Sequence, residues 1–199
     1  MQRLILPACA CAALALFACQ APYADSTTDA DTGTEAPALA GGMQASYPDE
    51  RTVVLERDFQ VEAAAVFAAN TREDLLKGWY PPQGWSLANS EVDARPGGSY
   101  RNEMSDGAEG VFVIYGEFSE VEFPTRVVFT ESYEGYDWAP LEVIVDIEPT
   151  SHSSCRVKLT VIHPSAEIHE LNSPMMVPAA AEAFERMEKF LLMLMAEGH

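Results

Sequence analysis

Basic residues are scarce in this chain. Its 199 residues include 12 Lys and Arg against 31 Asp and Glu, which gives a formal net charge of −19. Binding to nucleic acid needs concentrated Lys and Arg that contact phosphates, and docking to anionic lipid needs the same residues. The composition therefore argues against nucleic acid as a partner and indicates a self-repelling, acidic surface.

Cysteine is also scarce, with four residues in the whole chain. Cys9 and Cys11 fall in an apolar run near the amino terminus, and Cys19 ends that run. Cys155 is then alone in the rest of the chain, so we expect no disulfide framework. At the start of a predicted strand, Cys155 is expected to be a small buried residue rather than a reactive thiol.

The sequence carries no pattern typical of a metal or cofactor site. His152, His163 and His169 are not spaced with acids as in zinc or facial-triad sites. Gly97 and Gly98 lack the lysine and the following helix of a phosphate-binding loop. No nucleophile sits in a recognisable elbow either. We therefore expect neither a metal nor a cofactor.

The long apolar run is confined to residues 4–18, after a basic start at Arg3. At this length it is short for a membrane span and typical of an export signal. The residues Leu16-Phe17-Ala18-Cys19 resemble the lipobox of bacterial lipoproteins, which implies lipid on Cys19 and a signal peptide over residues 1–18. The alternative is ordinary cleavage near Ala21, which would release a secreted product.

Residues 19–50 are rich in Ala, Thr, Ser, Asp, Gly and Pro and contain six acids but no base between Gln20 and Glu50. Such a segment buries too little apolar surface to fold, so we expect an acidic disordered tether. Gln20 after the lipidated cysteine resembles the pattern for sorting to the outer membrane. We therefore expect an envelope lipoprotein at the periplasmic face of that membrane, anchored through Cys19.

Residues 51–199 show the periodicity of one folded domain. A half-buried strand is predicted over 52–59, two short helices over 61–69 and 71–77, and an aromatic loop over 79–85. Further strands are predicted at 87–94, 99–104, 111–121 and 126–132, followed by a hairpin at 141–148 and 157–161. The hairpin carries opposite charges on its two strands, as antiparallel pairs favour.

One long helix is predicted over residues 178–196, with Pro178 at its first position. An apolar stripe follows its helical period and consists of Ala180, Phe184, Met187, Leu191 and Leu194. This order of elements predicts an α+β fold, in which an antiparallel sheet of about six to seven strands carries the long helix.

Several segments together resemble a known family. They are Arg57 with Phe59, DLLKGWYP at 74–81, DARPGG at 93–98, GEFSEV at 116–121, VVFT at 127–130 and FERMEKFL at 184–191. In this order they resemble the homologues of the Aha-type activator of heat-shock-protein ATPase, within the START-like SRPBCC superfamily. The resemblance implies a helix-grip fold, in which a curved sheet grips the C-terminal helix around a hydrophobic cavity.

The chain departs from this family at the start of the long helix. Bacterial members tend to have Gly-Trp where this chain has Ala179-Ala180. The missing indole predicts more room there, unless Met175 and Met176 fill the gap. We therefore expect an open pocket between Ala180, Phe184 and the loop at 79–85.

The leading hypothesis is an envelope-anchored module that binds a small apolar or amphipathic molecule. Its expected lining is Arg57, Trp79, Trp85, Tyr100, Phe112, Ile114, Tyr115, Ala180 and Phe184. Arg57 has two interpretations, because an arginine on the apolar face of a strand either anchors an anionic ligand group or forms an ion pair with a helix carboxylate.

Two other hypotheses remain open. One is a cyclase-like or dehydratase-like enzyme of the kind known among START-like folds. Its acid would be a cavity carboxylate with a raised pKa, and Glu117 and Glu131 are the candidates. The other is an interaction protein whose exposed aromatic patch contains Trp79, Trp85, Tyr136 and Trp138. The patterns favour a binding protein over an enzyme and do not identify a protein partner.

Overall fold

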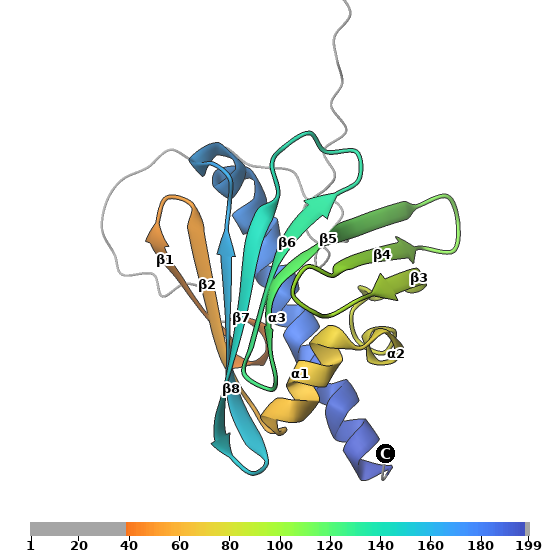
Figure 1. Ribbon diagram of the computed structural model, residues 1–199, viewed down its shortest axis with the longest axis vertical. Coiled ribbons are helices and arrows are strands. Elements are labelled where there is room, and N and C mark those ends of the chain that lie inside the picture. The colour runs from red at the N-terminus through yellow and green to blue at the C-terminus, as the bar shows by residue number, and fades with distance from the viewer. Residues whose placement is uncertain (1–38, 198–199) are drawn as a thin grey trace, which may run out of the picture.

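The computed structural model describes residues 39–197, which form one curved antiparallel sheet and a long helix (Figure 1). The sheet order is β1-β2-β8-β7-β6-β5-β4-β3. The strands are β1 (Gln44–Asp49), β2 (Thr52–Phe59), β3 (Ser86–Val92), β4 (Ser99–Ser105), β5 (Val111–Glu122), β6 (Arg126–Tyr133), β7 (Leu141–Ser151) and β8 (Ser154–Ile162). The predicted α+β class is confirmed, and the sheet has eight strands rather than six or seven.

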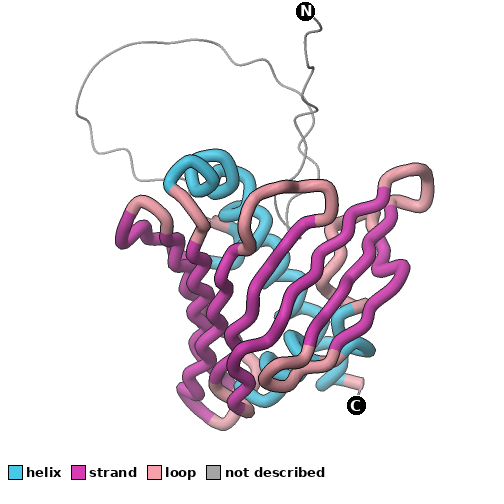
Figure 2. The backbone as a smooth tube through the Cα atoms, turned by 45° about the horizontal axis from the view of Figure 1, so that its top comes forward, coloured by secondary structure: helices cyan, strands magenta, loops and turns pink. Residues whose placement is uncertain are grey.

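Alternation along the strands decides which residues face the helices. Figure 2 shows the helices on one side of the sheet. Inward positions are buried on the central strands, for example Val143, Val145 and Ile147 on β7. The β7–β8 register sets Asp146 opposite Lys158. The predicted pairing of opposite charges is confirmed.

The long helix α3 (Ala166–Ala196) starts well before the predicted first position. The Ser165 hydroxyl caps it by accepting a hydrogen bond from the Ile168 N–H at 3.3 Å. Pro174 and Pro178 lie inside the helix, so the expected start at Pro178 was wrong. Burial of Met176 and Val177 against the core offsets the hydrogen bonds that the prolines cannot donate.

Edge strand β1 lies within the segment 19–50, which was expected to be a disordered tether. All six of its residues are exposed, and it is held by backbone pairing to β2. A one-turn 3-10 helix, η1 (Ala40–Gly42), precedes it, and the neighbouring Met43 is buried. Backbone hydrogen bonds do not depend on side-chain polarity, so composition alone did not reveal this strand.

Three expectations concern residues before position 39. The signal peptide at 1–18, the lipid on Cys19 and the tether up to residue 38 lie outside the described residues. Within residues 39–197, no helix is long and apolar enough to cross a membrane.

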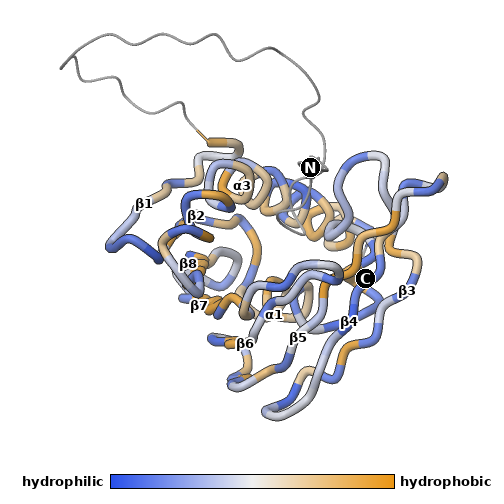
Figure 3. Tube along the Cα trace, turned by 90° about the horizontal axis from the view of Figure 1, so that it is seen from above, coloured by the Kyte–Doolittle hydropathy of each residue, from blue (hydrophilic) through white to orange (hydrophobic). Residues whose placement is uncertain are grey.

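Two short helices follow β2, as predicted, although their bounds differ. They are α1 (Ala63–Thr71) and α2 (Glu73–Leu76). In Figure 3 the sheet bends around α1 while α3 runs along its open side. The segment that links α2 to β3 is bonded to α1 and α3 through Trp79, and it builds one wall of the site.

Candidate functional site

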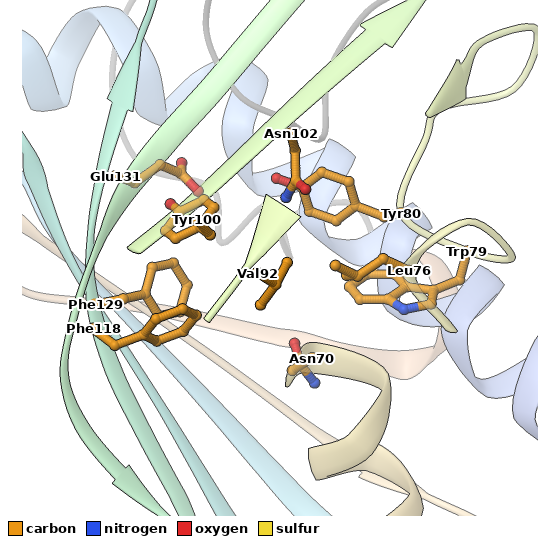
Figure 4. Close-up of a pocket in the computed structure, with 10 residues that line it drawn as sticks. All are labelled: Asn70, Leu76, Trp79, Tyr80, Val92, Tyr100, Asn102, Phe118, Phe129 and Glu131. Atoms are coloured by element: carbon orange, nitrogen blue, oxygen red, sulfur yellow. The ribbon is translucent and has the colours of Figure 1, made fainter. Parts of the chain in front are cut away.

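A cavity of about 60 Å³ lies between the segment after α2 and the inner face of β4, β5 and β6 (Figure 4). Most of its lining side chains are apolar or aromatic, and three are amides or an acid. The lining residues are Asn70, Leu76, Trp79, Tyr80, Val92, Tyr100, Asn102, Phe118, Phe129 and Glu131. This volume admits a chemical group of a few heavy atoms.

Strand alternation directs the sheet residues into the cavity. Tyr100 and Asn102 are two positions apart on β4, and Phe129 and Glu131 are two positions apart on β6. Residues with this spacing share a face of the sheet. Both strands flank β5, whose inward residue Phe118 completes this wall.

A glycine makes room for the Tyr100 ring. Gly116 on β5 pairs directly with Tyr100 on β4. A Cβ atom at Gly116 would lie 1.7 Å from the Thr130 carbonyl oxygen and 2.9 Å from Cε1 of Tyr100. Without that atom, the Tyr100 ring crosses β5 and its hydroxyl donates to the Thr130 carbonyl oxygen at 3.0 Å. The glycine thus sets the position of this ring.

The sheet wall contains three aromatic rings in mutual contact. The Tyr100 and Phe129 rings meet edge to face with centroids 5.5 Å apart, and the Tyr100 and Phe118 centroids are also 5.5 Å apart. The Phe118 and Phe129 centroids are separated by 5.9 Å. Such pairs hold one another in place beyond their simple burial.

The opposite wall consists of Trp79 and Tyr80, whose rings meet edge to face at 5.6 Å. The Trp79 indole N–H donates to the Ala69 carbonyl oxygen of α1 at 3.0 Å. Arg186 on α3 donates from Nε to the Trp79 carbonyl oxygen at 3.2 Å. Both helices therefore fix this wall.

Glu131 is the acid in the cavity lining. The Tyr133 hydroxyl donates a hydrogen bond to Oε1 of Glu131. None of the ion pairs found within residues 39–197 includes Glu131. Burial of the carboxyl raises its pKa, and the Tyr133 hydrogen bond offsets only part of that shift.

The phenols around Glu131 are neutral at ordinary pH. Burial first, and the Glu131 charge second, raise the pKa values of Tyr80, Tyr100 and Tyr133 well above the usual range. The Ser90 hydroxyl donates to Oδ1 of Asn102 at 2.7 Å, which orients that amide. The cavity therefore offers fixed phenols and an amide around one carboxyl.

Comparison with protein families matches residues 60–191 to the family described as "Activator of Hsp90 ATPase homolog 1-like protein". The chain belongs to this family. No curated protein matches the chain at a significant level.

Solved structures show the same fold as this family member. A protein from Rhodobacter sphaeroides is 20% identical with a TM-score of 0.69, and the match covers 78% of this chain and 100% of the other. A protein from Nitrosomonas europaea is 25% identical with a TM-score of 0.67, over 75% of this chain and 99% of its own. The architecture is the START-like helix-grip fold.

Three residues singled out in the sequence lie around the cavity of this family member: Trp79, Tyr100 and Glu131. Phe112 and Ile114 face inward on β5 but do not line the cavity, and Phe112 stacks on the Tyr133 ring at 5.7 Å.

Tyr115 and Glu117 lie on the outer face of β5, so their expected place in the cavity is corrected. Both are exposed, Tyr115 by 44%. They share the parity of the outward residues, whereas Ile114 and Phe118 point inward. The sequence has apolar residues on both faces of β5, so either face could have lined the cavity. In the structure the face that contains Tyr115 and Glu117 points away from the cavity.

Arg57 forms an ion pair with Glu188 of α3, and this confirms the ion-pair interpretation. It is buried, is not among the cavity residues, and has its Cζ 5.0 Å from the Phe59 ring centroid. Its guanidinium also packs against the backbone of η1, because a Cβ on Gly41 would lie 2.6 Å from Cζ.

The cavity does not lie between Ala180, Phe184 and the loop at 79–85, where the sequence predicted an open pocket. Ala180 is fully buried, and Phe184 packs against Phe59 with ring centroids 5.6 Å apart. Neither residue lines the cavity. The helix begins earlier than expected, so these positions lie at its middle, where the core is filled.

The expected aromatic surface patch is also corrected. Trp79 is only 4% exposed. Trp85, Tyr136 and Trp138 are partly buried and pack against the core, and the Tyr136 and Trp138 centroids are 4.6 Å apart. These rings stabilise the fold rather than forming one exposed surface.

Sequence reasoning missed the other seven lining residues, among them Tyr80, Asn102, Phe118 and Phe129. Strand alternation offered a signal for three of them, because Asn102 follows Tyr100 by two positions, Phe129 precedes Glu131 by two, and Phe118 shares the inward face of β5. No such signal existed for Tyr80, whose place depends on how the loop after α2 packs.

Proposed function

We propose that this protein is an envelope-anchored binding module that holds one end of a small amphipathic molecule. The observation that carries the proposal is the cavity itself, in which aromatic walls surround one carboxyl and two oriented amides. Ligand sites typically combine apolar walls with a few convergent polar groups. Membership of the family and the helix-grip architecture support a binding role.

The size of the cavity bears on how much of the ligand it encloses. At about 60 Å³ it is smaller than the roughly 150 Å³ cavity that admits a benzene ring. A head group fits this space, whereas an acyl chain or a ring system does not. We therefore propose that the polar end of the ligand enters the cavity and that its apolar part lies along the cavity mouth.

The envelope location rests on the amino-terminal sequence, in which an apolar run ends at Cys19. A lipid on Cys19 would place the cavity beside a membrane, a source of amphipathic molecules. Substituting Cys19→Ser should release the protein from membranes in a cell-fractionation experiment. Continued retention of the variant in the membrane fraction would contradict lipidation.

The binding proposal is tested by native mass spectrometry of protein extracted from its own envelope. We expect a co-purifying small molecule in the native chain and its loss in Val92→Phe, which fills the cavity. Val111→Phe is the matched control, because Val111 is 59% exposed and does not line the cavity. Equal recovery of the molecule from both variants would show that it binds outside this cavity.

The raised pKa of Glu131 favours a second function, that of an enzyme that uses this residue as an acid. A carboxyl with a raised pKa that faces a cavity is suited to donate a proton to a bound substrate. If the protein is such an enzyme, incubation with the recovered molecule should change its mass or its chromatographic retention time, and Glu131→Gln should abolish that change. An unchanged mass and retention time with the native chain would exclude this function for that molecule.

A further inference from the structure

We propose that the group held in the cavity is an organic ammonium ion, either a protonated amine or a quaternary ammonium. This inference rests on the proposed binding function and adds the chemical class of the ligand's head. It is carried by two features of the same cavity, its aromatic walls and its acid without a cationic partner.

The walls resemble the aromatic cages that suit ammonium ions. Tyr100, Phe118 and Phe129 form one wall, and Trp79 and Tyr80 form the other. Ring faces attract a cation electrostatically, and the attraction is strongest when both partners are removed from water. Figure 4 shows these rings arranged around the space between β6 and the segment after α2.

The cavity supplies a counter-ion as well. Glu131 of β6 lines the cavity, and none of the ten lining residues is Lys, Arg or His. The ionisable groups around its carboxyl are the phenols of Tyr80, Tyr100 and Tyr133, all neutral donors. An ammonium ion would provide the charge that the fold does not.

One arginine contacts the backbone of the opposite wall but does not line the cavity. Arg186 donates a hydrogen bond to the carbonyl oxygen of Trp79. The shift in the Glu131 pKa has burial and the Tyr133 hydrogen bond as its causes, and no basic group contributes to it.

The charge of the whole chain favours the same class of ligand. A net charge of −19 attracts cations toward the surface and repels anions. An anionic head would meet both this field and the Glu131 carboxylate. A neutral hydroxyl head would gain hydrogen bonds but neither the ion pair nor the attraction to the ring faces.

Isothermal titration calorimetry with three matched amphiphiles tests the inference. The probes are hexyltrimethylammonium, hexanol and hexanoate, which differ in head group and share one tail. We expect the ammonium to bind roughly tenfold more tightly than the alcohol, and the carboxylate to bind most weakly. Glu131→Gln should remove most of the ammonium preference.

The control separates the cavity from the acidic surface. Glu142→Gln removes one exposed charge from the outer face of β7 and should leave the preference unchanged. In the native chain, ammonium affinity should rise with pH over the range in which Glu131 ionises, because the ion binds the charged carboxylate. The quaternary head itself does not titrate, so Glu131→Gln should flatten this profile.

The outcomes distinguish the two proposals. Equal affinity for all three probes would overturn the ammonium inference and support binding of amphiphiles in general. Ammonium binding that is unchanged in both Glu131→Gln and Val92→Phe would show attraction to the surface only, and would overturn the inference. No binding of any probe would contradict the binding function on which the inference rests.

Discussion

Arg57 and Glu131 both face inward from the same sheet, yet their surroundings differ. Arg57 on β2 pairs with Glu188 of α3 and lies over the Phe59 ring. Glu131 on β6 faces the cavity, and its hydrogen-bond partner among the described residues is the neutral Tyr133 hydroxyl. Arg57 therefore has a partner of opposite charge within the fold, and Glu131 has none among the described residues.

The difference teaches how a buried charge should be interpreted. An ion with a partner holds its helix against the sheet and contributes to structure. An acid without a cation has a raised pKa and leaves an interaction for a ligand to complete. Burial is common to both residues, so the partner, rather than burial, separates a structural charge from a candidate site.

The largest expected effect comes from breaking the paired charge. Glu188→Gln should lower the free energy of unfolding by roughly 3 kcal/mol, because it leaves the Arg57 guanidinium buried without a counter-ion. Urea denaturation measures this loss. Glu185→Gln on the same helix should cost little, because Glu185 pairs with the exposed Lys189. Similar losses in both variants would contradict the structural role of the pair.

Substitution of Gly116, beside the cavity residue Tyr100, should destabilise the protein. Gly116→Ala should lower the free energy of unfolding by roughly 1–3 kcal/mol, since the new methyl group overlaps the Thr130 carbonyl and the Tyr100 ring. Ser99→Ala, at an exposed position next to Tyr100, is the control. A Gly116→Ala protein as stable as the control would show that Tyr100 is not constrained there.

A smaller effect should appear in the pH dependence of stability. The folded state binds its Glu131 proton more tightly than the unfolded chain does, so this group stabilises the protein at low pH. Its contribution is lost as pH rises from the ordinary glutamate pKa through the raised one. The loss is about 1.4 kcal/mol for each pH unit of the shift.

Denaturation of the native chain and Glu131→Gln across this range measures that contribution. The variant should gain stability relative to the native chain as pH rises. The comparison of two chains removes the opposite trend from acids such as Asp58, whose pKa is lowered by the Arg156 hydrogen bond. A constant difference between the chains would contradict the raised pKa of Glu131.

The smallest expected effect concerns the Cys155 thiol, which should not react with a thiol reagent in the folded protein. Cys155 is buried on β8 opposite Phe59, in the half of the sheet that contains Arg57, and burial raises its pKa to about 11. Labelling by a thiol reagent should be undetectable in the folded protein and rapid in urea. Fast labelling without denaturant would show that this half of the sheet opens.

Strand parity in the sequence anticipated much of the fold. The alternation on β7 and β8, the charges across their hairpin and the ion pair of Arg57 follow from local pattern and from the cost of burying an arginine alone. The pattern did not anticipate β1, which is an edge strand with no buried residue. Nor did it anticipate that α3 would continue through Pro174 and Pro178.

The candidate site was anticipated only in part. Glu117 and Glu131 were equal candidates in the sequence, because both are acids on predicted strands. Their separation depends on which face of each strand meets the helices, and the structure turns Glu117 to solvent and Glu131 to the cavity. The indole of Trp79 was placed near the site, whereas the role of Tyr80 was not seen.

The sequence by itself determined the acidic character, the α+β class and the alternation of the β7–β8 hairpin, because charge and alternation are local properties of the chain. The tertiary structure alone decided which inward residues surround empty space. That outcome depends on distant contacts, such as the bond from Trp79 to Ala69 and the room that Gly116 leaves for Tyr100. A cavity forms where side chains from several elements fail to fill the space between them, and no single segment encodes it.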